Sequence, residues 1–348
     1  MSPARQAAFH ILMRVEGGAW ASELLLAHTR DLDSRDAGLA REIVFGCLRF
    51  QAQLDFLLAL HARRRLDTEV RIALRMGVYQ IRCLDRVPGH AAVSESVELV
   101  KSAGLRSAAG LVNAVLRRVG GEPAKWPDRA TELSCPTWLL DRWDERFGRE
   151  IADGIARAFL QPPEAYVAAS GRVQDIGSQS IVPLLELQPG ETFLDVCAAP
   201  GNKTAQALEA GVQAIACDVH AHRLRALQDL NCRRVALDAT RPLPFTTQFD
   251  KVLVDAPCSG TGTLGRNPEI KWRLHASDLD ELHARQVSIL RNALEHVKPG
   301  GAIVYSTCSL EREENEDVIA EIGGEWQISQ RIPGRDPGDG FFAALLRL

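Results

Sequence analysis

The sequence predicts an α/β fold in which a Rossmann-like sheet domain follows an all-α helical domain. Over roughly the first 125 residues, apolar residues recur near helical spacing; from about residue 173, short apolar runs alternate with amphipathic segments. Such alternation is typical of a parallel sheet with helices on both faces. The predicted divisions are a helical domain over 1–126, a linker with connecting helices over 127–172, and a sheet domain over 173–348.

The helical domain is predicted from six segments that Gly, Pro or Asp signals separate. They read RQAAFHILMRV, ASELLLAHTR, LAREIVFGCLRFQAQLDFLLALHARR, EVRIALRMGVYQIRCL, AAVSESVELVKSA and AAGLVNAVLRRV. Two shorter helices, WLLDRWDERFG and EIADGIARAFL, are predicted in the linker and lead to QPP at 161–163. The front of the chain is therefore expected to be a helix bundle.

The sheet domain is predicted from seven strand-like runs with helices between them. The runs are TFLDVC, VQAIACDV, RRVALD, FDKVLVDA, GAIVYSTC, EWQISQ and FFAALLRL, and the helices are expected at 202–210, 220–231, 277–297 and 311–322. In sheets of this type, ligands bind at the carboxyl ends of the strands. We therefore expect the site there.

Composition excludes several classes of protein. The chain has 348 residues with 46% apolar and 25% charged residues, as in ordinary globular proteins. It has no apolar run near the ~18 residues of a membrane span, and MSPARQAAFHILMRVEGG lacks a signal peptide's apolar core, so a cytosolic protein is expected. Its eight cysteines form neither CxxC pairs nor zinc-spaced clusters, so we expect neither disulfides nor a metal.

The charge is divided unevenly along the chain. Residues 1–130 contain 19 Lys and Arg against 14 Asp and Glu, whereas residues 131–348 contain 22 against 31. The basic front half suggests a polyanionic partner, and HARRRL at 61–66 is its densest basic cluster. For any single arginine, a solvated helix face is the alternative explanation.

The stretch FLDVCAAPGNKT at 193–204 predicts a ligand-binding turn. Asp195 ends a strand, Gly201 permits close approach of the backbone, and the free N–H groups of a helix from Asn202 suit a carboxylate or phosphate. A nucleotide-triphosphate loop would require glycines where Cys197 and Asn202 stand. That class of site is therefore excluded.

Two further acids follow the next two strands. Asp218 lies about where an acid commonly binds a ribose hydroxyl pair, and Asp238 could reach the exocyclic amine of a purine. Each alone could instead be a helix cap or turn residue. Three acids in register at strand ends predict a cofactor that carries adenosine.

Two cysteines follow strands at the same expected edge, Cys258 in VLVDAPCSGTG and Cys308 in IVYSTCSLEREEN. Most cysteines are inert buried thiols, but two at one edge, one of them near Asp255, favour chemistry. Adding a thiolate at C6 of a pyrimidine would make C5 nucleophilic enough to accept a methyl group. Asp255 could hydrogen-bond N3 and the amino group of the base, which would select cytosine.

A thiol with a pKa near ~8.5 is only a few per cent thiolate at neutral pH, so the site needs a group that stabilises the anion. A positive neighbour, a base or hydrogen bonds from the substrate would serve. The candidate cations in the sequence are Lys203, Arg266 and Lys271.

Four motifs resemble, in order, those of the Sun/Fmu-type RNA cytosine-5 methyltransferases: DVCAAPGNKT, DAPCSGTGTLGRNPEIKW, YSTCSLEREENEDVI and DGFFAALLRL. The helical front half resembles the RNA-binding NusB domain of the bacterial rRNA members. The resemblance implies a class I methyltransferase fold, S-adenosylmethionine as cofactor, and 5-methylcytosine formation in small-subunit (16S) ribosomal RNA. Neither a membrane nor a metal is implied.

The resemblance also assigns roles to residues of this chain. It implies that Cys308 is the nucleophile, that Cys258 assists product release and that Asp255 orients the base. The implied cofactor residues are Cys197, Ala198, Ala199, Pro200, Gly201, Asn202, Lys203, Asp218, Asp238 and Asp255.

The chain departs from the family pattern in two places. Asn202 replaces the second glycine of the turn, and because Asn tolerates a left-handed conformation we expect the turn to be kept. Only EAYVAASGRV separates QPP from Gln174 and Asp175, where the family usually inserts a small RNA-recognition-like subdomain. A reduced RNA-docking surface is therefore expected.

Two alternative functions compete with methyl transfer. An RNA-binding or antitermination-like factor with a decayed catalytic half would explain the short middle segment. A nicotinamide oxidoreductase would rest on GTGTLG at 260–265, but the following RNPEIKW is turn-like rather than helical. The intact acids and cysteines favour the methyltransferase.

Overall fold

The computed structural model describes residues 1–62, 65–120, 124–168 and 170–348. Arg63 and Arg64 of the predicted basic cluster, and Ala169 of the short middle segment, lie outside the described residues. Within these ranges, no helix is both long and apolar enough to cross a bilayer. The same ranges contain no group of three or more His, Cys, Asp or Glu side chains arranged to hold a metal ion.

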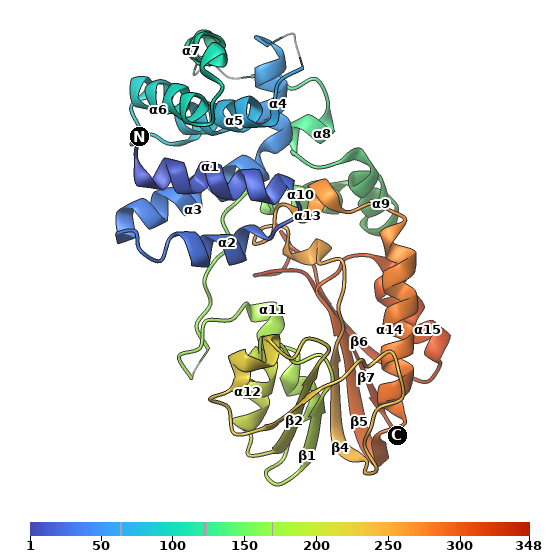
Figure 1. The fold of residues 1–348 in the computed structure, drawn as a ribbon. Helices are drawn as coiled ribbons and strands as arrows, with labels where there is room; N and C mark the ends of the chain where they lie inside the picture. The colour runs from blue at the N-terminus through green and yellow to red at the C-terminus, as the bar shows by residue number, and fades with distance from the viewer. Residues whose placement is uncertain (63–64, 121–123, 169) are drawn as a thin grey trace. The chain divides into compact units, whose positions relative to one another are not determined.

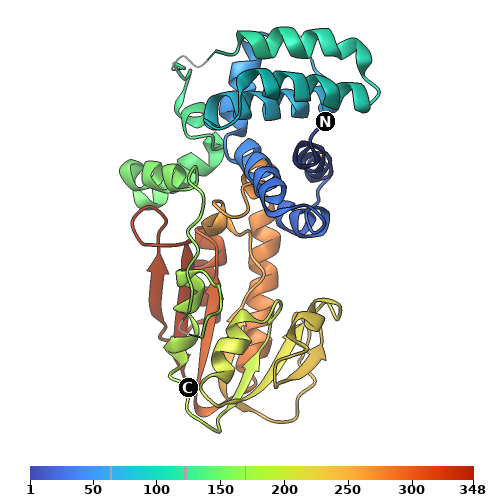
Figure 2. The same ribbon diagram turned by 90° about the vertical axis from the view of Figure 1, so that its left-hand side faces the viewer.

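The chain forms two compact units, one of which is helical. The helical unit comprises Met1–Gln161 together with Asn267–Trp272. Its long helices (Figures 1 and 2) are α1 (Pro3–Glu16), α2 (Ala21–His28), α3 (Ser34–Arg49), α4 (Gln51–Ala59), α5 (Thr68–Cys83), α6 (Gly89–Ser102), α7 (Ala109–Arg118), α9 (Thr137–Phe147) and α10 (Arg149–Ala158). The short elements are η1 (Arg106–Ala108), α8 (Arg129–Glu132) and most of α13 (Ile270–Arg273).

One apolar core holds α1 to α7 together, which confirms the predicted helix bundle. Two of these helices begin at side-chain caps: Ser2 caps α1, and Asp33 caps α3 by accepting from the Asp36 N–H. The predicted helix over 39–64 was wrong in one respect, because the structure breaks it at Phe50 into α3 and α4.

A six-residue segment from the second half of the sequence, Asn267–Trp272, belongs to the helical unit. Glu269 accepts from the Ala21 N–H at 2.8 Å, and the Trp272 indole N–H donates to the Leu48 carbonyl at 2.8 Å. The chain therefore leaves the sheet unit within the motif that contains Cys258 and returns to it at Arg273, directly after that motif.

The other unit comprises Pro162–Arg266 and Arg273–Leu348 and contains a seven-stranded sheet in the described part of the chain. The strands, in spatial order 3-2-1-4-5-7-6, are β1 (Thr192–Asp195), β2 (Gln213–Asp218), β3 (Arg233–Ala236), β4 (Phe249–Asp255), β5 (Val297–Thr307), β6 (Gln327–Arg331) and β7 (Phe341–Arg347). All seven predicted strands are present. The predicted parallel pairing is confirmed for β1 to β5, whereas β7 runs antiparallel to both β5 and β6, which the prediction of a parallel sheet did not include.

Helices cover both faces of this sheet (Figure 1). On one face α14 (Asp278–Leu294) and α15 (Glu316–Ile322) pack against alternate strand residues such as Leu194 and Val252. On the other face α12 (Asn202–Leu208) and η2 (Val182–Leu185) pack against Phe193 and Leu253. Side chains of successive strand residues point to opposite faces, so fully apolar strands supply both cores.

The remaining short elements are α11 (Ile176–Gln179), η3 (Arg223–Leu227), η4 (Thr261–Thr263) and η5 (Arg312–Glu314). The predicted helix over 220–231 was wrong, since only η3 forms there. Its Leu224 and Leu227 pack with Ala198 and Ala216 in a small core of their own. Tertiary packing, rather than helix propensity, sets this segment.

Candidate active site

The thiols of Cys258 and Cys308 lie together at the carboxyl ends of two neighbouring strands. Cys258 follows β4, Cys308 follows β5, and these strands are paired in parallel. The two Sγ atoms are 3.4 Å apart. The pKa of Cys258 lies well above its ordinary value, because the thiol hydrogen-bonds to Cys308 and is buried. The two cysteines therefore meet at one edge of the sheet, as the sequence predicts.

The backbone around Cys308 is held by glycines of the GTGTLG motif. The Gly262 N–H donates to the Cys308 carbonyl at 2.9 Å, and the Gly340 N–H donates to the Gly262 carbonyl at 2.8 Å. A Cβ at Gly262 would lie 2.4 Å from the Gly340 oxygen and 2.8 Å from the Cys308 oxygen. The motif thus braces the cysteine loop instead of forming a dinucleotide turn.

Asp255, the last residue of β4, is held through both of its oxygens. The buried Lys203 Nζ lies 2.7 Å from Oδ2, and the Ser306 hydroxyl donates to Oδ1 at 2.8 Å. Lys203 Nζ also lies 5.3 Å from the centre of the Phe341 ring. The orientation of Asp255 is consequently fixed by an ion pair and a neutral hydrogen bond.

The turn after β1 is shaped by Gly201. Its φ of +107° is left-handed, and an added Cβ would lie 2.5 Å from Leu227 Cγ, so both conformation and space require glycine. A cis peptide bond joins Ala199 and Pro200 just before it. Asn202 is instead the first residue of α12 and has no positive φ, so the turn does not depend on the tolerance of Asn for a left-handed conformation.

A cavity of about 670 Å³ opens at this edge of the sheet. It is lined by predicted residues from five strand ends: Cys197, Ala199, Asp218, Asp238, Asp255, Cys258 and Cys308. The other predicted cofactor residues, Ala198, Pro200, Gly201, Asn202 and Lys203, do not line it. Lys203 reaches the cavity only through Asp255.

The carboxylates near the cavity differ in their surroundings. Asp218 is buried at the end of β2 and accepts from the His220 N–H at 2.8 Å. Asp238 is more exposed, and hydrogen bonds from the Thr240 hydroxyl and N–H lower its pKa. Behind them, burial raises the pKa of Asp195 to about 7, although the Thr204 hydroxyl donates to it at 2.6 Å. The buried Asp195 therefore supports the turn through its hydrogen bond with Thr204, whereas Asp218 and Asp238 line the cavity.

Two of the three candidate cations for the thiolate are engaged elsewhere. Arg266 forms ion pairs with Asp175 at 3.0 Å and Asp339 at 2.5 Å. Lys271 belongs to the helical unit, where its buried Nζ donates to the Arg49 carbonyl at 2.9 Å. Burial lowers the pKa of Lys271 to about 8. These two expectations were wrong.

Sequence reasoning missed several residues of the site. His220, Arg223 and Arg285 line the cavity beside the predicted acids. Glu314, in the EREEN stretch after Cys308, is buried and accepts from both Ser259 and Ser309. The only signal for Glu314 was its place six residues after Cys308 within a quoted motif.

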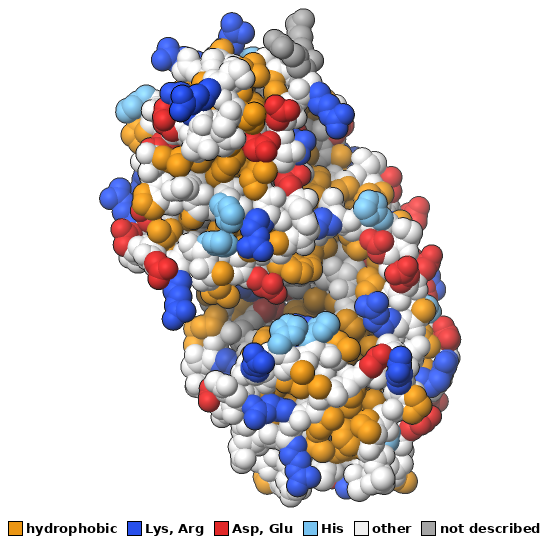
Figure 3. All heavy atoms as spheres, in the orientation of Figure 1, with side chains coloured by type: hydrophobic (Ala, Val, Ile, Leu, Met, Phe, Trp, Pro, Cys, Tyr) orange, Lys and Arg blue, Asp and Glu red, His pale blue; other side chains and the backbone are white. Residues whose placement is uncertain are grey.

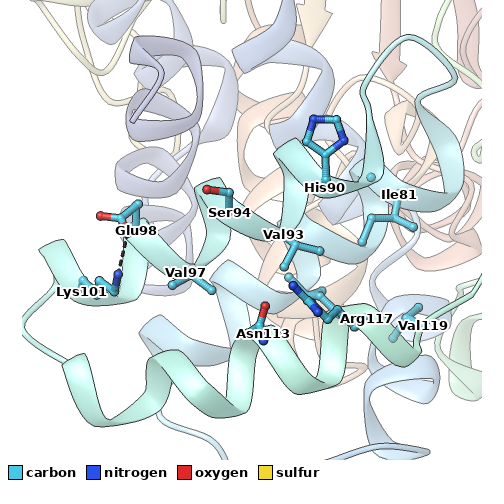
Figure 4. Close-up of a pocket in the computed structure, with 12 residues that line it drawn as sticks. Ile81, His90, Val93, Ser94, Val97, Glu98, Lys101, Asn113, Arg117 and Val119 are labelled. Atoms are coloured by element: carbon cyan, nitrogen blue, oxygen red, sulfur yellow. Dashed lines mark hydrogen bonds and ion pairs between the residues drawn. The ribbon is translucent and has the colours of Figure 1, made fainter.

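The helical unit has a separate groove of about 610 Å³ between α6 and α7, which lie side by side (Figures 1 and 2). Figure 4 shows Val93 and Val97 of α6 and Asn113 of α7 at this groove. Its rim includes Arg117 and Lys101, and Lys101 pairs with Glu98 at 2.7 Å. The floor is therefore apolar and the rim partly cationic.

Elsewhere on the helical unit, charge is mixed. On the face drawn in Figure 3, Lys and Arg side chains are scattered among acidic and apolar ones. The basic surplus of the front half is thus spread over the surface on that face, not gathered in one patch.

Two protein families and a solved structure match this chain. The family described as "16S rRNA methyltransferase RsmB/F" matches residues 182–325, and the NusB family matches residues 2–120. The solved structure of PH0851 covers 99% of this chain, and the chain covers 98% of it, with a TM-score of 0.81 at 22% identity, which is a likeness of fold. The match over 182–325 contains both cysteines and Asp255.

Two curated relatives extend along nearly the whole chain. Ribosomal RNA small subunit methyltransferase B of Cronobacter sakazakii is 32% identical over 417 aligned positions, covering 95% of each chain. The probable ribosomal RNA small subunit methyltransferase B of Bacillus subtilis is 30% identical and covers 90% of this chain and 87% of the relative. Because 417 positions exceed the 348 residues here, the first relative contains segments that this chain lacks. Given this identity over nearly its full length, the chain belongs to the ribosomal RNA small subunit methyltransferase B family.

Proposed function

We propose that this protein methylates C5 of a cytosine in small-subunit (16S) ribosomal RNA through a covalent cysteine adduct at C6. The observation that carries the proposal is the pair of thiols 3.4 Å apart beside an acid-lined cavity. RNA methylation follows the family; the base, the position on the ring and the adduct are inferred from the residues.

S-adenosylmethionine is the cofactor, and the cavity beside β1, β2 and β3 fits it. A volume of about 670 Å³ lies within the range of small-molecule sites, and the buried Asp218 suits a ribose hydroxyl pair. Asp238 suits an amine of the adenine. When bound, S-adenosylmethionine supplies a sulfonium methyl group to a carbon nucleophile.

The two thiols divide the work on the base. We assign the nucleophile to Cys308, whose addition at C6 would make C5 enamine-like. The raised pKa of Cys258 keeps its thiol protonated, so its S–H can donate to the Cys308 thiolate before attack. After methylation the C5 proton passes to solvent as the C6–Sγ bond breaks and Cys308 leaves as a thiolate, and the Cys258 S–H can donate to that departing thiolate and so assist product release.

Selection of cytosine is assigned to Asp255. Each carboxylate oxygen has two acceptor sites, so Asp255 can accept from the cytosine amino group while keeping Lys203 and Ser306. Uracil presents a carbonyl at that position and would face the carboxylate with an acceptor. The Lys203 ion pair keeps Asp255 oriented for this contact.

RNA docking is assigned in part to the helical unit, residues 1–126 in the predicted division. The support is its net charge of +5 over residues 1–130 and the cationic rim of the α6–α7 groove. Placement in the cytosol, the absence of a metal and the remaining domain boundaries stay predictions.

Comparing cells with and without the gene tests the proposed function. Bisulfite sequencing of 16S RNA should show one or more cytosines protected only when the gene is present. Complementation with Cys308→Ala should not restore protection, whereas complementation with the parent should. Identical protection in both strains would contradict the proposal that this protein methylates a cytosine of this RNA.

A further inference from the structure

One buried carboxylate contacts the residues that follow both cysteines. Glu314 has no exposed surface. The Ser259 N–H donates to its Oε1 at 2.8 Å, and the hydroxyls of Ser259 and Ser309 both donate to its Oε2. The loops after β4 and β5 are therefore joined through a single side chain.

A third element completes this network. Gln286 of α14 donates through Nε2 to Glu314 Oε1 at 3.0 Å and to the Pro257 carbonyl at 2.9 Å. The four donors around Glu314 require a group that only accepts, as an ionised carboxylate does. A glutamine at this position would place its amide N–H donors against the donor groups of Ser259, Ser309 or Gln286.

The network favours a single arrangement of the two loops. Burial raises the pKa of Glu314, and the hydrogen bonds from Ser259 and Ser309 oppose that shift. A buried carboxylate is costly unless its oxygens are hydrogen-bonded, so movement of either loop would leave it partly unsatisfied. Each serine is the next residue after a cysteine, so the anchored serines determine where the thiols lie.

We propose that Glu314 is a positioning residue that sets the spacing of the Cys258 and Cys308 thiols by holding Ser259 and Ser309. Glu314 does not line the cofactor cavity, so it acts on the thiols and not on the cofactor. The kinetic consequence rests on the proposed function, because adduct formation and release both need the two thiols in register. The spacing itself does not depend on that function.

Thiol–disulfide exchange measures the spacing without any RNA. In glutathione buffers, Cys258 and Cys308 lose two electrons and two protons to form a disulfide, and one glutathione disulfide becomes two glutathione thiols. The equilibrium constant reports the effective concentration of one thiol at the other. Peptide mass spectrometry identifies the Cys258–Cys308 disulfide among the eight cysteines. Glu314→Gln should lower this constant by about tenfold.

The control is Glu325→Gln, which makes the same chemical change at an exposed glutamate. It should match the parent in the exchange equilibrium. If Glu314→Gln does not fold, Ser309→Ala removes one of the two serine anchors and should lower the constant in the same direction. A constant within twofold of the parent in the folded variant would overturn the proposal.

Kinetics separate positioning from a loss of folded protein. Glu314→Gln should lower kcat for RNA methylation by about tenfold or more, while calorimetry gives a Kd for S-adenosylmethionine within twofold of the parent. A merely structural defect would instead reduce active sites for cofactor and RNA together. If the parent itself transfers no methyl group, the proposed function fails, and the exchange equilibrium still decides the role of Glu314.

Discussion

The Sγ atoms of Cys258 and Cys308 lie 3.4 Å apart although fifty residues separate them in the sequence. Pairing of β4 with β5 brings their loops to one edge, and Gly262 braces the Cys308 backbone. A spacing this short is what the proposed action of both sulfurs on one pyrimidine ring requires. In the proposed mechanism, the other groups of the site hold the two thiols, select the base and bind the cofactor.

Replacing Lys203 by Met should lower methyl transfer about 10- to 100-fold, because Asp255 loses its buried charge partner. Steady-state kinetics with RNA measure this effect, and the Kd for S-adenosylmethionine should change less than threefold because Lys203 does not line the cavity. Lys298→Met is the matched control, since Lys298 pairs with Asp250 at 2.8 Å away from the cavity residues. Equal activity in both variants would remove Lys203 from the catalytic scheme.

Replacing Asp218 by Ala should weaken S-adenosylmethionine binding about 10- to 100-fold, because a hydrogen bond to a buried charged group contributes about 1.5–3 kcal/mol. Isothermal calorimetry gives the constant directly. RNA affinity should stay within twofold. Asp229→Ala, at an exposed acid outside the cavity lining, is the control and should bind the cofactor like the parent. Unchanged binding in Asp218→Ala would place the ribose elsewhere.

The α6–α7 groove is tested by the salt dependence of RNA binding. If Arg117 contacts a phosphate, Arg117→Ala should lower the slope of log K against log salt by about 0.7–0.9. The Kd for RNA should rise several-fold at moderate salt. Arg35→Ala, an exposed arginine of the same unit outside the groove, should keep the parent slope. Identical slopes for the two variants would exclude the groove as a phosphate contact.

Asp195 gives the stability of the cofactor-free sheet unit an unusual pH dependence. Its folded-state pKa of about 7 lies above the ordinary 3.8, so between these values the folded protein holds a proton that the unfolded chain releases. The contribution of Asp195 to the free energy of unfolding therefore falls as pH rises through this window, by at most about 1.4 kcal/mol per pH unit, and levels off above pH 7.

Asp195→Asn lacks this titration. The stability of Asp195→Asn relative to the parent should therefore increase from pH 5 to pH 7 and then stay constant. Amide exchange of β1 in increasing urea measures the difference, with the exposed Asp229→Asn as a pH-independent control. A difference between Asp195→Asn and the parent that does not vary with pH would contradict the raised pKa.

Much of the site could be predicted because the sheet obeys a simple rule. Strands read from apolar runs place Asp218, Asp255 and the two cysteines at one edge, since parallel strands share a direction. The direction of β7 could not be read this way, because an apolar run has the same pattern in either direction.

Glu314 escaped prediction for a different reason. Its partners Ser259 and Ser309 meet it only through strand pairing and a tight turn, and neither spacing nor periodicity encodes two loops and a helix converging on one carboxylate. Likewise, the turn was expected to be kept because Asn tolerates a left-handed conformation, but the chain uses Gly201 for that conformation and begins α12 at Asn202. The position of Glu314 and Asn202 within motifs indicated that they lie near the site, but it did not predict the contacts of Glu314 or the conformation of Asn202.

Covalent trapping tests the central claim most directly. Cys258→Ala, incubated with substrate RNA and S-adenosylmethionine, should accumulate an enzyme–RNA adduct that survives a denaturing gel, with the RNA attached to the peptide containing Cys308. The double variant Cys258→Ala with Cys308→Ala should give no adduct. No adduct from a folded Cys258→Ala protein that binds both RNA and cofactor, or attachment at another residue, would contradict thiol addition by Cys308.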